Sequence, residues 1–330
     1  MITRLDYIDK LRGFAIFLVV VGHLYQEHTI EGNSYPFSQM IYSFHMSLFF
    51  FVSGYLCEAT HKIDKLGYGT FIKKKAVALL LPYLFWVLVV SFLLTDHPVD
   101  SIQDFVMQFN FFPNKLFWFM PVLFLAMLVY AIQYAIISKS DSLKNRLLFI
   151  CSVCSILSIF GCIVHQYGLL IYSVYMASFL IGALLMYMPR IQTMLLDNKA
   201  YMGGGSIMLC ILWFFYPFDA NGRALYSFLN VVLTYMCSAC AIVVLFVFFY
   251  KTVLNKYIDS FFSEMGKMSI VIYLTPLSFL PKGFVFEGLT MTSENVVILI
   301  IAVIHCLVAY AIGRVVYTIP YLKLIVYGKK

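Results

Sequence analysis

Two ionisable residues stand at opposite ends of the apolar stretch RGFAIFLVVVGH, residues 12 to 23. In a helix, Arg12 and His23 would lie roughly 16 Å apart, about half the thickness of a bilayer's hydrocarbon core. Ionisable groups are costly in lipid and mark a functional site by default. An imidazole can move a proton near neutral pH, and a guanidinium is a fixed cation. The plainer alternative for Arg12 is snorkelling to the cytoplasmic interface.

A second histidine, His45, lies in the next apolar run, YSFHMSLFFFVSGYL. Consecutive membrane spans are antiparallel, so His23 and His45 are both expected beyond mid-membrane on the outer side. A lone membrane histidine is more often a packing or hydrogen-bonding residue. Two histidines at matched depth on adjacent helices favour a site for proton transfer.

Further charged residues fall on the same side as Arg12. Asp9 precedes Arg12 by three positions, a spacing that supports an ion pair on a helix surface. Lys73, Lys74 and Lys75 open the third apolar run. Taken alone, these lysines are typical membrane anchors, but they would also supply counter-charges to a polyphosphate ligand from the cytosol.

The late run GKMSIVIYLTPLSFLP is short and contains Pro276 and Pro281. Proline inside a span frees backbone carbonyls, which is tolerated where they face protein or a wet cavity. We therefore expect this helix to form a cavity wall, with Ser269 and Tyr273 available to substrate.

The composition dictates how these residues are held. The 330 residues are 62% hydrophobic and only 12% charged, against about 25% charged in soluble proteins. The sequence therefore predicts an all-α, polytopic membrane bundle. The net charge of +7 does not indicate nucleic acid, because the basic residues follow membrane topology. The eight cysteines lie in or beside apolar runs and are expected to be packing residues, with no metal site.

Apolar windows predict about ten membrane spans in a single domain covering residues 1–330, with no cleavable signal peptide and no appended soluble domain. Most of the 23 Lys and Arg residues fall in inner segments if the N-terminus is cytoplasmic, which places both termini inside. The predicted spans are 10–27, 38–57, 75–95, 115–137, 146–164, 168–188, 202–217, 225–250, 267–281 and 295–318.

The segment YIDKLRGFAIFLVVVGH resembles the signature of the acyltransferase family 3 membrane proteins, and is most similar to its fucose-4-O-acetylase-like subgroup. IYSFHMSLFFFVSGYL, KKK…LLLPY, LFWFMPVLF and GKMSIVIYL follow in the order of that family. The sequence departs from the family's pattern at Ala78, where a second basic residue is frequent, and at Thr275, where many members have histidine.

The resemblance implies transfer of an acyl group, usually acetyl from cytosolic acetyl-CoA, to a hydroxyl of a surface polysaccharide or lipid-linked saccharide. Carried over by position, His23 is the catalytic histidine, Arg12 its essential partner, and His45 and Ser53 belong to the second motif. Donor-binding residues would be Arg12, Asp9 and the three lysines. Ser53, Trp118, Tyr273 and Ser269 would contact substrate, although Trp118 also fits an ordinary interfacial aromatic belt.

Acetyl-CoA would be a co-substrate, with no permanently bound cofactor. The expected partners are acetyl-CoA, a glycan acceptor and the bilayer, in the cytoplasmic membrane of a prokaryote, and a homodimer stays open. Direct transfer and a covalent acyl-histidine relay also both stay open. The main alternative is a transporter or flippase for a polyprenyl-linked saccharide, which ten helices and intramembrane histidines fit as well. A membrane sensor or scaffold would leave His23 and Arg12 unexplained.

Overall fold

The computed structural model describes residues 6–29, 36–90, 117–137, 143–163, 168–215, 228–275, 285–286 and 290–329. Over these residues the regular elements are helices, so the all-α prediction is confirmed. The chain divides into two compact units, each described by itself. Unit 1 comprises residues 1–59 and 177–312, and unit 2 comprises residues 60–176 and 313–330.

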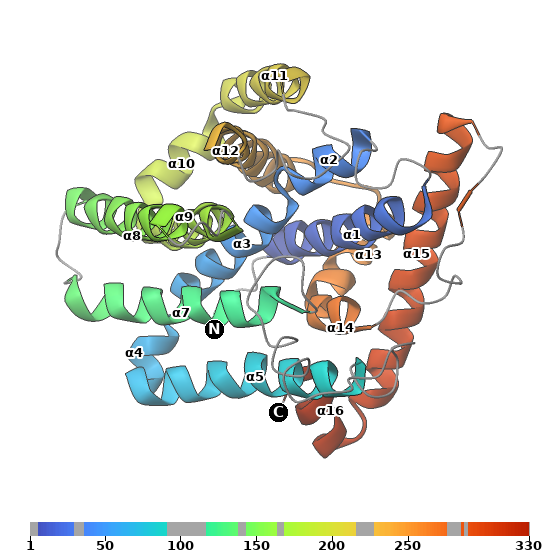
Figure 1. The fold of residues 1–330 in the computed structure, drawn as a ribbon, viewed down its shortest axis with the longest axis horizontal. Helices are drawn as coiled ribbons and strands as arrows, with labels where there is room; N and C mark the ends of the chain where they lie inside the picture. The colour runs from blue at the N-terminus through green and yellow to red at the C-terminus, as the bar shows by residue number, and fades with distance from the viewer. Residues whose placement is uncertain are drawn as a thin grey trace. The chain divides into compact units, whose positions relative to one another are not determined.

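Unit 1 is built around α1 (Asp6–His28), whose first turn carries Asp6 and Asp9 at the positive end of the helix dipole. Figure 1 shows α13 and α14, in orange, next to the blue α1. Other helices pack on this group, with α11 lying along α12. The remaining bounds in unit 1 are α2 (Pro36–Tyr42), α3 (His45–Ala59), α10 (Pro189–Asp197), α11 (Lys199–Phe215), α12 (Phe228–Lys251), α13 (Lys256–Lys267) and α14 (Ser269–Leu274).

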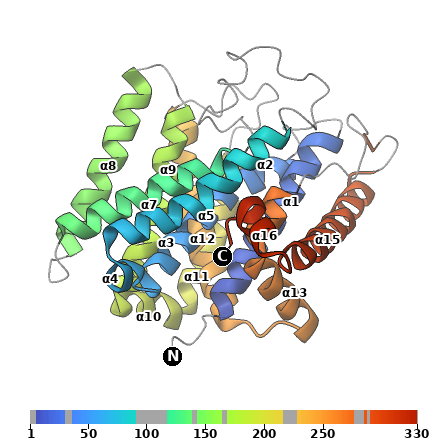
Figure 2. The same cartoon turned by 90° about the horizontal axis from the view of Figure 1, so that it is seen from below.

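Unit 2 contains a pair of long helices, α5 (Tyr68–Val89) and α7 (Phe119–Ile136), which pack against each other. The C-terminal α16 (Pro320–Tyr327) also contacts α5 (Figure 2). The Trp86 indole Nε1 donates to the Val326 carbonyl over 3.0 Å, which ties α16 to α5. This unit further contains α4 (Lys62–Leu66) and α8 (Leu143–Ile163), whereas α9 (Gly168–Tyr187) and α15 (Met291–Val316) have residues in both units.

Most predicted spans correspond to helices whose ends differ by a few residues. Within the described residues, six helical stretches are long and apolar enough to cross a membrane. The predicted spans at α1, α5, α11 and α14 fall outside these six; α1 contains Arg12 and His23, and α5 contains the three lysines. The total of ten spans and the cytoplasmic placement of both termini stay predictions, as does the single domain.

The predicted span 38–57 is present but broken. Helix α2 ends at Tyr42 and α3 begins at His45, with a turn at Ser43 and Phe44 between them. The turn is held from outside: Trp213 Nε1 donates to Ser43 Oγ over 3.1 Å, and Ser238 Oγ donates to the Ser43 carbonyl over 3.1 Å. These bonds satisfy polar groups that an apolar interior would otherwise leave unpaired.

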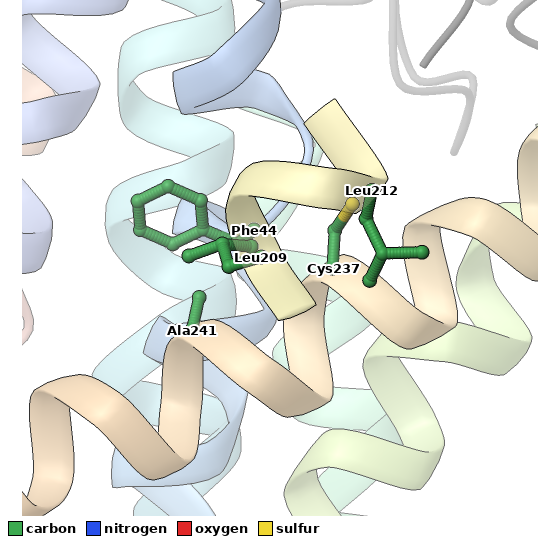
Figure 3. Close-up of a cluster of buried hydrophobic side chains, with 5 residues drawn as sticks. All are labelled: Phe44, Leu209, Leu212, Cys237 and Ala241. Atoms are coloured by element: carbon green, nitrogen blue, oxygen red, sulfur yellow. The ribbon is translucent and has the colours of Figure 1, made fainter. Parts of the chain in front are cut away.

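Apolar packing completes the support of this turn. Phe44 is buried in a cluster with side chains of α11 and α12 (Figure 3). Because the cluster residues on α11 and α12 follow Phe44 by more than 150 positions in the sequence, the support of this turn comes from tertiary structure. The cluster consists of Phe44, Leu209, Leu212, Cys237 and Ala241.

The segment between the eighth and ninth predicted spans contains a further helix. Helix α13 begins after Asn255, whose side chain accepts a hydrogen bond from the Tyr257 backbone N–H over 3.0 Å. The α13 helix buries one face on α1, where Lys10 pairs with Asp259 at 3.0 Å. The predicted span 267–281 is described only as α14 and Thr275; Pro276 and Pro281 lie outside the described residues.

Close backbone contact fixes two helix crossings in unit 1. A Cβ atom on Gly13 of α1 would lie 1.8 Å from the Phe262 carbonyl oxygen, and one on Gly266 would lie 1.9 Å from the Asp9 carbonyl oxygen. Likewise, a Cβ on Gly54 of α3 would lie 1.8 Å from the Phe179 carbonyl oxygen of α9. Only glycine permits such contact. The first crossing sets the position of the α1 turn that bears Arg12.

Candidate active site

His23 and His45 lie on either side of one aromatic ring. The Tyr42 ring is 6.4 Å from the His23 ring and 5.0 Å from the His45 ring between centroids, and both contacts are edge-to-face. His23 is half-buried near the end of α1, and His45 is only 3% exposed at the start of α3. The structure thus brings together the two histidines that the sequence places at matched depth. Their chemical roles stay predictions.

The hydrogen bond of His45 defines which ring nitrogen carries its proton. Nδ1 lies 2.8 Å from the Ile41 carbonyl oxygen. A carbonyl oxygen only accepts, so Nδ1 is the donor, and in the neutral ring Nε2 carries the lone pair. This bond crosses the α2–α3 break, so the turn at Ser43 and Phe44 helps to set the orientation of the imidazole.

Polar side chains surround His23 at the same end of α1. The Tyr42 hydroxyl donates to Gln26 Oε1 over 2.8 Å. Gln26 follows His23 by three positions and Glu27 by four, so both side chains share a face with the histidine, and both are exposed. Gly22 is buried against α2: a Cβ atom there would lie 3.5 Å from Tyr42 Cε2. Tyr42 and Gln26 were not predicted from the sequence.

Arg12 and His23 lie on the same face of α1. Residues eleven apart in an α-helix differ by about 20° around the axis and roughly 16 Å along it. On this face, Ala15, Ile16 and Val19 lie between the two residues and are buried. The part of this face between Arg12 and His23 is therefore covered by protein.

The first turns of α1 contain most of the predicted donor-side residues of unit 1. Arg12 and Asp9 are half-buried, and the Asp9 carbonyl contacts Gly266 of α13. Lys10 was not predicted as a site residue. It forms salt bridges with two acidic side chains, since its Nζ lies 3.1 Å from an Asp6 carboxylate oxygen and 3.0 Å from an Asp259 carboxylate oxygen.

The lysine cluster belongs to unit 2, on the first turns of α5. Lys73 and Lys74 are exposed, and Lys75 is half-buried with its Nζ 5.5 Å from the centroid of the Phe71 ring. That distance is within the range of a cation–π contact. Within the cluster, Lys73 and Lys74 are thus more exposed than Lys75.

The predicted substrate residues fall in separate parts of the fold. Ser53 is half-buried in α3, and Tyr273 is half-buried in α14. Ser269 begins α14 and is 1% exposed; among the described residues its Oγ has no hydrogen-bond partner. Trp118 belongs to unit 2, where its ring stacks on Tyr172 and Tyr175 with centroids 5.9 and 5.5 Å away. Their roles in substrate binding stay predictions.

Two of the residues that sequence reasoning missed, Gln26 and Tyr42, had a local signal. Gln26 follows His23 by three positions, and Tyr42 precedes His45 by three. Residues at this spacing are neighbours on a helix surface. Which of the polar side chains at such positions would meet one another could be seen only after α1 and α2 were packed together.

Comparison with known proteins agrees with this architecture. An acyltransferase domain family matches residues 5–316. Nodulation protein NolL of Mesorhizobium japonicum is 30% identical over 127 residues, which cover 37% of this chain and 34% of the relative. Nodulation protein NolL of Sinorhizobium fredii is 40% identical over 82 residues, 24% of this chain and 22% of the relative. No solved structure matches.

The helical fold, with its long apolar helices, defines a multi-pass membrane protein of the all-α class. Within that class, the chain belongs to the acyltransferase domain family, whose model covers nearly its whole length. The matched stretches span about a third of one curated relative and about a fifth of the other. The acyl donor, the acceptor and the roles of individual residues are therefore proposals for this chain.

Proposed function

We propose that the protein is a membrane O-acyltransferase that moves an acetyl group from cytosolic acetyl-CoA to a saccharide hydroxyl, with His23 as the general base. The acceptor would be a surface polysaccharide or a lipid-linked saccharide. Membership of the acyltransferase family supports the reaction class. The observation that carries the site is the meeting of His23 and His45 at the Tyr42 ring.

The chemistry needs one base near the outer end of α1. The acceptor hydroxyl oxygen attacks the thioester carbonyl carbon while an imidazole nitrogen of His23 takes the hydroxyl proton. The C–S bond then breaks, and the coenzyme A thiolate leaves and takes up a proton. The new C–O bond completes the ester. The lone pair that His45 keeps on Nε2 could accept a hydrogen bond from a second hydroxyl of the saccharide, since the attacking hydroxyl gives its one proton to His23.

The donor side follows from charge and reach. Arg12 and the lysines at 73 to 75 are cations suited to the phosphates of acetyl-CoA. The separation of about 16 Å between Arg12 and His23 on α1 is of the order that an extended pantetheine arm covers. The thioester can then reach His23 while the phosphates stay at the other end of the helix.

The direct test is acetyl transfer in membrane vesicles that contain the full chain and native glycans. With radiolabelled acetyl-CoA, the wild type should label glycan, and His23→Ala should lose about 10²- to 10⁴-fold in rate, the usual contribution of general acid–base catalysis. Equal quantities of monodisperse protein in detergent would show that the variant folds. Wild-type transfer by a well-folded His23→Ala protein would overturn the proposal.

Mass spectrometry of surface glycans, with and without the gene, identifies the acceptor and the acyl mass together. An acetyl increment that depends on His23 supports the proposal. Movement of a lipid-linked saccharide across the membrane, with no coenzyme A released and no acyl group added, would favour the transporter instead.

A further inference from the structure

Tyr42 joins α2 to α1 beside His23 through two kinds of contact. The edge-to-face contact holds the Tyr42 and His23 rings with their centroids 6.4 Å apart. At its other end, the Tyr42 hydroxyl donates to Gln26 Oε1 over 2.8 Å. Gln26 lies three residues after His23 on α1. One tyrosine therefore contacts the imidazole directly and also fixes the side chain one turn beyond it.

The amide oxygen of Gln26 can serve two donors. A carbonyl oxygen has two lone pairs, and the Tyr42 hydroxyl occupies one of them. The Gln26 side chain also lies within hydrogen-bonding reach of His23. If the oxygen is the acceptor, the bonded nitrogen of His23 carries the proton, and the other nitrogen holds the lone pair that a base needs.

We propose that Gln26 and Tyr42 are positioning residues for His23: the Gln26 oxygen accepts the imidazole N–H, and Tyr42 holds both that oxygen and the ring in place. This inference rests on the proposed function of His23 as the base. It gives the site a neutral orienting acceptor, in the place that a carboxylate occupies in many histidine-based sites.

The surroundings favour positioning over a purely structural role. Gln26 is exposed, so a side chain of equal length can replace it without opening a cavity. Packing between α1 and α2 does not depend on the hydroxyl, since the Tyr42 ring and Ile41 already lie against Gly22. Removing the hydroxyl or the amide oxygen therefore changes the orientation of His23 and leaves the helix contact in place.

Substitutions of matched size isolate the two hydrogen bonds. Gln26→Met keeps the side-chain length and removes the acceptor, Tyr42→Phe keeps the ring and removes the donor, and Gln26→Glu restores an acceptor oxygen. Tyr25→Phe is the control: the Tyr25 hydroxyl, on the same end of α1, donates to Asn295 Oδ1 over 2.7 Å. It removes one bond of similar length without touching the Gln26 oxygen.

The measurement is steady-state acetyl transfer from radiolabelled acetyl-CoA to glycan in vesicles, normalised to monodisperse protein. We expect kcat to fall about 10- to 100-fold in Gln26→Met and Tyr42→Phe, with KM for acetyl-CoA unchanged, as for loss of a group that orients a reacting side chain. Gln26→Glu should recover most of the kcat lost in Gln26→Met, and Tyr25→Phe should match the wild type.

The same set of variants separates the two proposals. If His23→Ala transfers acetyl as well as the wild type, the proposed function fails, and the positioning role falls with it. If His23→Ala is inactive while Gln26→Met and Tyr42→Phe keep wild-type kcat, the function stands and the positioning inference is wrong. A Gln26→Glu variant no faster than Gln26→Met, or a Tyr25→Phe variant as slow as Tyr42→Phe, would also overturn it.

Discussion

At the scale of single residues, the two nitrogens of His45 have separate tasks. Nδ1 is bonded to the Ile41 carbonyl across the α2–α3 break, and Nε2 is left with the lone pair. The first task is structural and the second would be chemical. Because asparagine places its amide nitrogen near the position of Nδ1 and glutamine near that of Nε2, substitution can separate them.

We expect His45→Asn to retain the hydrogen bond to the Ile41 carbonyl, so that its free energy of unfolding stays within about 1 kcal/mol of the wild-type value. The rate of acetyl transfer should nevertheless fall roughly 10²-fold. His45→Ala should lose both, since the Ile41 carbonyl is then left unpaired in a buried position. Thermal unfolding in detergent and transfer rates in vesicles measure the two effects. Full activity in His45→Asn would reduce His45 to a structural residue.

The sequence predicted the proximity of His23 and His45 because topology alone fixes the depth of residues on consecutive spans. It did not predict Tyr42 and Gln26 as site residues, because their importance depends on how α2 turns toward α1. Ser269 illustrates the opposite case. It was predicted as a substrate residue, and its buried Oγ, without a partner among the described residues, is compatible with a ligand contact but does not identify one.

At the scale of elements, long apolar runs were sufficient to locate helices but not their breaks or their partners. The run 38–57 is continuous in hydrophobicity. The turn at Ser43 is hydrogen-bonded to Trp213 and Ser238, which lie far away in the sequence. Helix α13 lies between the predicted spans 225–250 and 267–281, where no helix was predicted. Asparagine is a common N-cap residue, so Asn255 could have indicated the start of α13 from the sequence. The surface of α1 that α13 covers could not be predicted in this way.

A hydrogen-bonded group at the other end of α1 shows a similar dependence on tertiary structure. The Tyr7 and Tyr55 hydroxyls lie 2.7 Å apart, and Gln192 of α10 donates to Tyr55 over 2.8 Å. Burial, together with the bond to Tyr55, raises the pKa of Tyr7, which precedes the predicted span. A tyrosine hydroxyl is protonated at neutral pH in any case, so the group can join α1, α3 and α10 throughout the physiological range, and the raised pKa extends this to more alkaline pH.

The glycine crossings make the sharpest prediction about elements. A methyl group on Gly13, Gly54 or Gly266 would meet backbone oxygen at 1.8 to 1.9 Å, so Gly→Ala at each position must push the helices apart. We expect a loss of about 1–3 kcal/mol in stability, as for overpacked cores. The measurement is the midpoint of thermal unfolding in detergent.

The matched control is Gly204→Ala. Gly204 also lies inside a helix, α11, but nothing is within 4 Å of the position that its Cβ would take. This substitution should be neutral or stabilising by about 0.5–1 kcal/mol, because alanine is the better helix former. If Gly13→Ala behaved like Gly204→Ala, the crossing of α1 and α13 would not be as close as the structure has it.

At the scale of the whole molecule, two groups of cations are proposed to bind the phosphates of acetyl-CoA, namely Arg12 and the lysines at 73 to 75. Arg12 lies in unit 1 and the lysines at 73 to 75 in unit 2. We expect Arg12→Ala, and separately neutralisation of the three lysines, to raise the KM for acetyl-CoA, because each removes charge assigned to phosphate. The wild-type KM should itself rise with salt, since Debye screening weakens exposed pairs first.

Lys75 offers an internal comparison within the cluster. It is half-buried over the Phe71 ring, whereas Lys73 and Lys74 are exposed. Steady-state rates against acetyl-CoA at two salt concentrations should therefore show a larger increase in KM for Lys73→Gln or Lys74→Gln than for Lys75→Gln. An unchanged KM for acetyl-CoA in Arg12→Ala and in the triple-lysine variant would mean that these residues determine membrane orientation and do not bind the donor.

The orientation of the molecule decides whether transfer crosses the membrane. Charge asymmetry predicts that Lys74 faces the cytoplasm and that the His23 end of α1 faces outward. Glu27 and Lys74 are both exposed and therefore suit cysteine labelling. Gly22 and Ser47 are expected at the same membrane depth as His23 and His45, but they are buried and would not react with the reagent. All eight native cysteines must be replaced first, because Cys151, Cys162 and Cys210 are exposed.

In that background, a membrane-impermeant thiol reagent should modify Glu27→Cys only from outside and Lys74→Cys only from the cytoplasmic side. Acetyl-CoA should protect Lys74→Cys and leave external labelling of Glu27→Cys less affected, because donor phosphates and acceptor approach opposite ends of the site. Labelling of Lys74→Cys from outside would reverse the orientation. His23 would then lie on the same side as cytosolic acetyl-CoA, and the acceptor would have to be a cytoplasmic, lipid-linked saccharide.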